Sequence, residues 1–127
     1  MTFLSNMIKR YLILLLPVFL LFECSKKNNE KIITEPTEEE IVVVLYAEAV
    51  EALQKGDAFY AGKKFREAEN LMPQSEWAAK ASLMASYADY SRNSYSSAIF
   101  GLERHIDNYP ADKNIPYAHY LIAICYY

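Results

Sequence analysis

From its middle onward the chain repeats itself with a spacing of 37 residues. Ala61 is followed four positions later by Phe65, and Ala98 is followed four positions later by Leu102. Other stretches pair at the same spacing, namely Lys55-Gly56-Asp57 with Arg92-Asn93-Ser94, Leu53 with Tyr90, Tyr46 with Leu83 and Pro73 with Pro110. A period of this length predicts a stack of similar helical units that bury their apolar faces against one another.

Each unit has the pattern of two helices joined by a tight turn. Ser75 stands where a side chain can cap the first helix of the better-formed unit, and the apolar residues that follow it have helical spacing. Asn93 tolerates the left-handed conformation that closes a helix, and Gly56 has the same role one unit earlier. We expect Ser94 to cap the second helix, which must stop at Pro110 because proline blocks further helix.

The small residues Ala61 and Ala98 lie where two antiparallel helices must approach closely. Eleven tyrosines and six phenylalanines against three glycines also suit rings packed between helices better than a turn-rich β fold. The predicted fold is therefore an all-α helical-hairpin solenoid of about two and a half repeats. Its units are residues 41–73, 74–110 and an incomplete 111–127.

The first 23 residues have the layout of a secretory signal. Lys9 and Arg10 precede an uninterrupted apolar run of 12 residues, 11–22. A helix needs about 20 apolar residues to cross a bilayer, so a run of this length is more typical of a signal peptide than of a membrane span. We expect residues 1–23 to direct export.

Cys24 lies where the apolar run gives way to polar sequence, with Leu21 three positions before it. This arrangement resembles the lipobox of bacterial lipoproteins, which implies that lipid on Cys24 anchors the mature chain to a membrane. Glu23 departs from the pattern, because a small residue is usual just before the cysteine. The alternative is an uncleaved N-terminal anchor with an incidental cysteine.

Residues 24–40 are polar, carry Pro36 and end in three consecutive glutamates. Such a composition buries too little apolar surface to fold, which predicts a flexible tether between the lipid and the repeats. The glutamates would also suit the start of a helix, where negative charge meets the positive end of the helix dipole.

Composition and motifs exclude several classes of function. The formal net charge of −3 lacks the basic footprint that nucleic-acid binding needs. His105 and His119 are the two histidines, lie on different predicted helices and have no third ligand at metal spacing. There is no nucleophile motif or phosphate-binding glycine loop, and Cys125 reads as a small packed hydrophobe. We expect no enzymatic activity, no metal and no cofactor.

Helical pairs with small-to-aromatic spacing and a closing proline resemble tetratricopeptide repeats, whose usual period is about 34 residues. Residues 46–127 resemble, more narrowly, the BamD (ComL) family of lipoproteins. The stretches that carry this resemblance are LQKGD at 53–57, MPQSEWA at 72–78, ASYADY at 85–90, LERHIDNYP at 102–110 and IPYAHYL at 115–121. The last is the most specific, because three extra loop residues precede its helix.

The resemblance implies an outer-membrane lipoprotein on the periplasmic face, a component of the β-barrel protein assembly machinery with about five repeats. In that family the C-terminal repeats bind the BamA-type barrel subunit, and the N-terminal repeats contact unfolded outer-membrane proteins. We expect an N-terminal fragment, because the chain stops within an apolar helix at Tyr127. Another exported tetratricopeptide lipoprotein, acting as a cell-envelope scaffold, is the alternative.

Tyr46, Tyr87 and Tyr90 are the candidate peptide-binding residues. They fall on the first helix of each predicted pair, which lines the concave side of such solenoids. Tyrosine offers rigid contact area with one polar tip, which suits an extended peptide. Their spacing also follows the repeat, so packing between helices is the competing interpretation.

Overall fold

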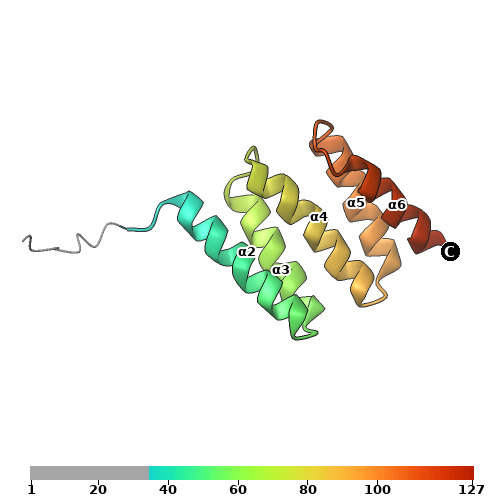
Figure 1. Ribbon diagram of the computed structural model, residues 1–127, viewed down its shortest axis with the longest axis horizontal. Helices are drawn as coiled ribbons and strands as arrows, with labels where there is room; N and C mark the ends of the chain where they lie inside the picture. The colour runs from blue at the N-terminus through green and yellow to red at the C-terminus, as the bar shows by residue number, and fades with distance from the viewer. Residues whose placement is uncertain (1–34) are drawn as a thin grey trace, which may run out of the picture. The chain divides into compact units, whose positions relative to one another are not determined.

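The computed structural model describes residues 35–127, and this part of the chain is all-α, as predicted. Its helices are α2 (Glu38–Gln54), α3 (Ala58–Leu71), α4 (Glu76–Ser91), α5 (Tyr95–Asn108) and α6 (Ile115–Tyr126) (Figure 1). The predicted signal peptide, the lipid-attachment residue Cys24 and most of the predicted tether lie outside the described residues.

Helix α2 begins at Glu38, so its first three residues lie within the predicted tether, 24–40. Thr37 and Glu40 form a capping box, in which the Glu40 amide donates to Thr37 Oγ1 at 3.3 Å and the Thr37 amide donates to Glu40 Oε2 at 2.8 Å. The glutamates at 38–40 occupy the first turn, where the helix dipole favours negative charge. The expectation that these glutamates start a helix is therefore confirmed.

The turns inside the two hairpins have the same geometry. Gly56 has φ of 85° and Asn93 has φ of 62°, both in the left-handed region. The amides at and just after these positions donate to carbonyls near the helix end: Gly56 to Leu53, Asp57 to Ala52, Asn93 to Tyr90 and Ser94 to Asp89. Both turns thus close their helix with the pair of bonds found in a Schellman motif. Equivalent bonds 37 residues apart confirm the repeat register.

Of the four helices that follow α2 in residues 35–127, α3 and α4 are capped by a side chain. Ser75 Oγ accepts from the Ala78 amide at 3.1 Å, as predicted, and Asp57 Oδ1 accepts from the Tyr60 amide at 3.0 Å. Ser94 makes no capping hydrogen bond, so that prediction was wrong. The backbone explains the difference between the two serines, because Ser75 is extended with ψ of 160° and Ser94 has ψ of 63°. Asp57 has a similar ψ of 70° and still caps its helix, since its side chain is one atom longer than that of serine.

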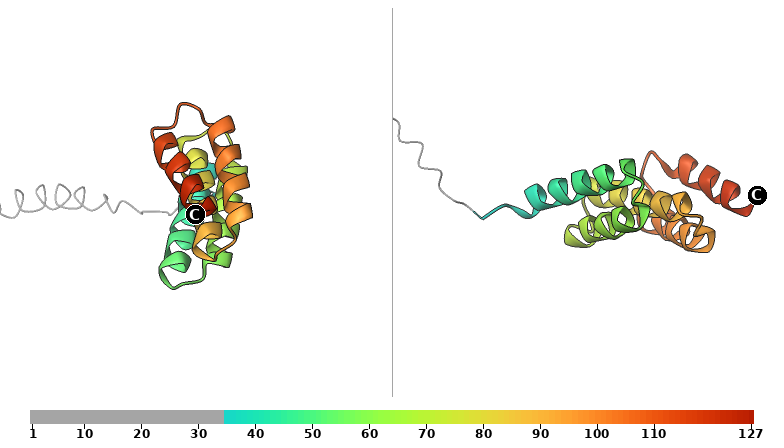
Figure 2. Two further views of the ribbon diagram at one scale, coloured as in Figure 1. Left: turned by 90° about the vertical axis from the view of Figure 1, so that its right-hand side faces the viewer. Right: turned by 90° about the horizontal axis from the view of Figure 1, so that it is seen from below.

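The helices stack in chain order, each packing on the next, and α4 also contacts α2 and α6. Helices α3 and α5 lie on one side of this stack, and α2 and α6 on the other (Figure 2). Ala61 and Phe65 in α3 and their equivalents Ala98 and Leu102 in α5 are all fully buried. Both predicted helix contacts are therefore present.

Helix α4 contributes to two apolar clusters. The first joins α2, α3 and α4 around Phe65, and the second joins α4, α5 and α6 around Leu102. In the first cluster α4 supplies small residues, Ala81, Ala85 and Ala88, which let it lie close to α3. No helix within residues 35–127 is long and apolar enough to cross a membrane.

Candidate protein-binding surface

Tyr87 and Tyr90 lie three positions apart on α4 and so share one face of that helix. Their ring centroids are 6.2 Å apart. Both rings are half-buried and pack against the cluster around Leu102. The structure therefore brings these two candidate residues together, with part of each ring left in solvent.

Neighbouring helices extend this aromatic surface. Tyr95, the first residue of α5, has its ring 5.9 Å from Tyr90, and on α6 the rings of Tyr117 and Tyr120 are 6.2 Å apart. Tyr95, Tyr117 and Tyr120 are all exposed. We call the set Tyr87, Tyr90, Tyr95, Tyr117 and Tyr120 the tyrosine face. Three helices build it, so its shape depends on how the hairpins stack.

Helix α6 contacts α4, and the pKa of Tyr117 on α6 is affected by phenols on both helices. Burial raises the pKa of the Tyr117 phenol, and the nearby phenols of Tyr87 and Tyr90 raise it further. Tyr117 therefore stays protonated and neutral at physiological pH. A neutral surface of rings and hydroxyls suits apolar side chains together with backbone polar groups, which is what an extended peptide offers.

Tyr46, the third candidate, belongs to a different aromatic cluster. Its ring packs edge-on against Phe65 at 5.2 Å and against Trp77 at 5.3 Å. Burial raises the pKa of its phenol. Tyr46 thus joins α2 to α3 and α4 in the first apolar cluster, and the structure does not bring it together with Tyr87 and Tyr90.

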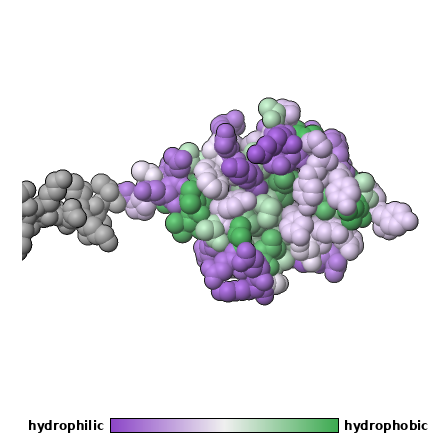
Figure 3. Space-filling model, in the orientation of Figure 1, coloured by the Kyte–Doolittle hydropathy of each residue, from purple (hydrophilic) through white to green (hydrophobic). Residues whose placement is uncertain are grey.

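Exposed apolar side chains also occur outside the tyrosine face. Val44 on α2 and Tyr126 near the end of α6 are more than half exposed. The space-filling view accordingly shows hydrophobic patches among polar ones (Figure 3). These side chains do not form a group of rings in contact with one another, as the tyrosine face does. The tyrosine face is therefore the better candidate surface.

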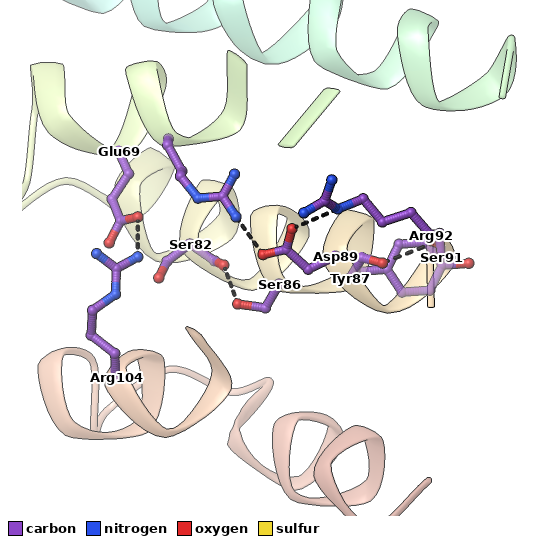
Figure 4. Close-up of polar contacts among 9 residues, drawn as sticks. Glu69, Ser82, Ser86, Tyr87, Asp89, Ser91, Arg92 and Arg104 are labelled. Atoms are coloured by element: carbon purple, nitrogen blue, oxygen red, sulfur yellow. Dashed lines mark hydrogen bonds and ion pairs between the residues drawn. The ribbon is translucent and has the colours of Figure 1, made fainter. Parts of the chain in front are cut away.

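A set of buried ion pairs was not anticipated from the sequence. Asp89 of α4 binds Arg66 of α3 and, at 3.3 Å, Arg92; Figure 4 shows the carboxylate between two guanidinium groups. Glu69 of α3 binds Arg104 of α5 at 2.8 Å. One signal was available: Asp89 stands next to Ala88, at a helix position whose equivalent one repeat earlier is the apolar Ala52.

The two histidines have different surroundings. His105 is fully buried, and its Nε2 lies 3.4 Å from Asp112 Oδ2. Burial lowers the His105 pKa, and the Asp112 carboxylate opposes that shift. His119 is exposed on α6, and burial raises the pKa of the half-buried Cys125 thiol. Within residues 35–127 no group of three or more His, Cys, Asp or Glu side chains is placed to hold a metal ion.

Comparison with known proteins assigns the family. Residues 38–127, which include every helix described above, match the YfiO family model, described as outer membrane lipoprotein. The chain belongs to this family. Membership confirms the resemblance seen in the sequence, and it favours the first of the two interpretations over an unrelated exported scaffold. No solved structure matches the chain.

Two relatives of this YfiO family chain carry the name outer membrane protein assembly factor BamD. The one from Caulobacter vibrioides is 41% identical over 90 residues, covering 71% of this chain and 30% of the relative. The one from Rickettsia prowazekii is 30% identical over 104 residues, covering 82% of this chain and 39% of the relative. The chain thus spans about a third of their length. Their name denotes an assembly factor, in agreement with the expected non-enzymatic role.

Proposed function

We propose that this chain is the client-binding part of a component of the outer-membrane β-barrel protein assembly machinery. Family membership and the name of both relatives support the general role. The observation that carries the specific role is the tyrosine face, an exposed aromatic surface shared by three helices. The client is an unfolded outer-membrane protein.

In this proposal an extended client segment lies across α4 and α6. Its apolar side chains contact the rings of Tyr87 and Tyr117, and the phenol hydroxyls hydrogen-bond its unpaired backbone groups. An unfolded barrel strand offers both features, because its side chains alternate and its backbone is not yet paired. The partly buried rings are held in place by the apolar cluster beneath them, which limits the entropy lost on binding.

The same proposal assigns partners and location. The BamA-type barrel subunit and other assembly lipoproteins bind mainly through repeats that correspond to parts of the relatives beyond the matched region. Residues 1–23 act as a lipoprotein signal, and lipid on Cys24 holds the protein on the periplasmic face of the outer membrane. Two or more acyl chains make such anchoring durable.

The test of client binding is fluorescence anisotropy with a labelled peptide from the C-terminal strand of an outer-membrane barrel protein. The full-length protein is compared with Tyr87→Ala and Tyr90→Ala. A ring at the centre of an interface contributes about 2 kcal/mol, so each variant should weaken binding roughly thirtyfold. Tyr60→Ala is the matched control, because Tyr60 lies on α3 and its hydroxyl bonds Glu48 on α2, away from the tyrosine face.

Circular dichroism should show that all three variants keep their helices. Unchanged affinity in folded Tyr87→Ala and Tyr90→Ala proteins would reject the tyrosine face as the client site. Equal weakening by Tyr60→Ala would show that the effect is not specific to that face.

The lipid anchor has its own test. Mass spectrometry of the membrane-extracted protein should find Cys24 as the acylated N-terminus, and Cys24→Ala should move the protein to the soluble periplasmic fraction. An intact Met1 start, or equal membrane association of the variant, contradicts the anchor without bearing on client binding.

A further inference from the structure

A groove is lined by residues of α3, α4 and α5. Helices α3 and α5 lie on the side of the stack away from α2 and α6 (Figure 2). The volume of the groove is about 390 Å³, and α4 forms its floor. The lining residues are Arg66, Ala85, Ser86, Asp89, Ser96, Ser97, Phe100, Gly101 and Arg104. No residue of the tyrosine face is among them, so the groove is a separate surface.

Charges in this region are arranged in two layers. The carboxylate-bearing side chains of Asp89 and Glu69 are only 6% and 5% exposed. The arginines that pair with them, Arg66 and Arg104, are 44% and 39% exposed. The groove lining thus carries two guanidinium groups and one carboxylate, and the positive groups are much more exposed than the carboxylates that pair with them.

The two arginines have donors to spare. Each guanidinium carries five N–H donors in a planar fork that matches a carboxylate. One nitrogen of Arg66 binds Asp89, and one nitrogen of Arg104 binds Glu69. These buried partners hold both guanidinium groups in fixed positions. A ligand carboxylate would meet donors that are already oriented, which lowers the entropy cost of binding.

The rest of the lining is suited to a peptide. Phe100 is 71% exposed at the rim and offers an aromatic face to an apolar side chain. Ser96 and Ser97 are exposed beside it on α5 and can hydrogen-bond a peptide backbone. A carboxylate site next to an apolar site inside a groove fits a chain of mixed side chains better than it fits a flat anionic membrane.

We propose that the groove between α3 and α5 binds an extended acidic segment of a partner protein. Carboxylates of the segment bind Arg66 and Arg104, and an apolar side chain contacts Phe100. The charge complementarity described above selects this occupant. The site is independent of the client site on the tyrosine face, so each can be tested while the other is intact.

The experiment measures binding of a fluorescein-labelled peptide in which glutamate alternates with phenylalanine, to the full-length protein at low salt. Ser97→Glu places a negative charge in the groove and should weaken binding about fivefold or more, whereas Ser97→Lys should strengthen it. Ser97 is exposed, so neither change disturbs the fold. Ala47→Glu adds the same charge at an exposed position on α2 and should leave affinity unchanged.

Two further measurements identify the ligand. Phe100→Ala should weaken the affinity for the same peptide. A peptide with lysine in place of glutamate should not bind. Equal effects of Ser97→Glu and Ala47→Glu would overturn the proposal, because they would show attraction to overall charge only. The proposal would also be overturned if the acidic peptide did not bind and the protein instead bound anionic vesicles. Weaker vesicle binding by Ser97→Glu would then assign the groove to lipid.

Discussion

The two complete hairpins, α2–α3 and α4–α5, share a backbone register and differ in what they bury. Positions Leu45, Ala49 and Ala52 on α2 correspond to Ser82, Ser86 and Asp89 on α4. The first set is apolar, and the second set is polar and buried. The repeat thus determines where the chain turns. The type of residue at equivalent positions differs because each helix packs against different neighbours.

The neighbours of α4 explain its polar residues. Helix α4 packs between α3 and α5, and its alanines at 81, 85 and 88 contact the hairpin before it. Of its buried polar residues, Ser86 lies against Gly101 of α5, and Asp89 pairs with Arg66 of α3. Buried charge is tolerated there because its partners are in place.

The largest expected effect is on the apolar centre of the first hairpin. Phe65→Ala removes a fully buried ring and should lower the free energy of unfolding by about 3–5 kcal/mol. Urea denaturation followed by circular dichroism measures it. Leu102→Ala, the equivalent change in the second hairpin, removes a smaller side chain and should cost less. A larger loss for Leu102→Ala would mean that the hairpins are not equivalent at this position.

A smaller effect is expected at the seam between α4 and α5. A Cβ added at Gly101 would lie closer to Ser86 Oγ than real Cβ contacts allow, so Gly101→Ala should destabilise by about 1–3 kcal/mol. The equivalent pair in the first hairpin is Lys64 and Ala49, without a hydroxyl. Ser86→Ala should therefore restore most of the loss. Thermal melts of the single and double variants check this, and no recovery in the double variant refutes it.

The smallest contrast concerns the two helix starts after the turns. Asp57 caps α3 with a side-chain bond, so Asp57→Ala should cost about 1 kcal/mol. Ser94 makes no such bond, so Ser94→Ala should change stability little. The same denaturation series measures both, and equal losses would show that Ser94 caps its helix in solution.

Features set by local chemistry were predictable from the sequence. The turns at Gly56 and Asn93 follow from the preference of glycine and asparagine for positive φ, and the closeness of Tyr87 and Tyr90 follows from helical spacing. The cap predicted at Ser94 was wrong because capping depends on a backbone angle that residue type does not fix.

Features set by stacking were not predictable. Tyr117 joins the tyrosine face because α6 packs against α4. The residue pattern does not predict how these two helices are oriented relative to each other. Arg66 and Asp89 are 23 positions apart and meet across two helices. For Tyr46, the position in the repeat suggested the binding side of the stack, whereas its contacts place it in the first apolar cluster.

The contacts between hairpins join residues that are close in the sequence, and this affects how fast the chain folds. Side-chain bonds that link them, such as Arg104 to Glu69 and Tyr109 Oη to the Pro73 carbonyl, span 35 and 36 positions. Such local contacts favour rapid folding that spreads from one hairpin to the next. Opening should spread in the same way, one hairpin at a time, which hydrogen exchange of the backbone amides would show as groups of amides that exchange together.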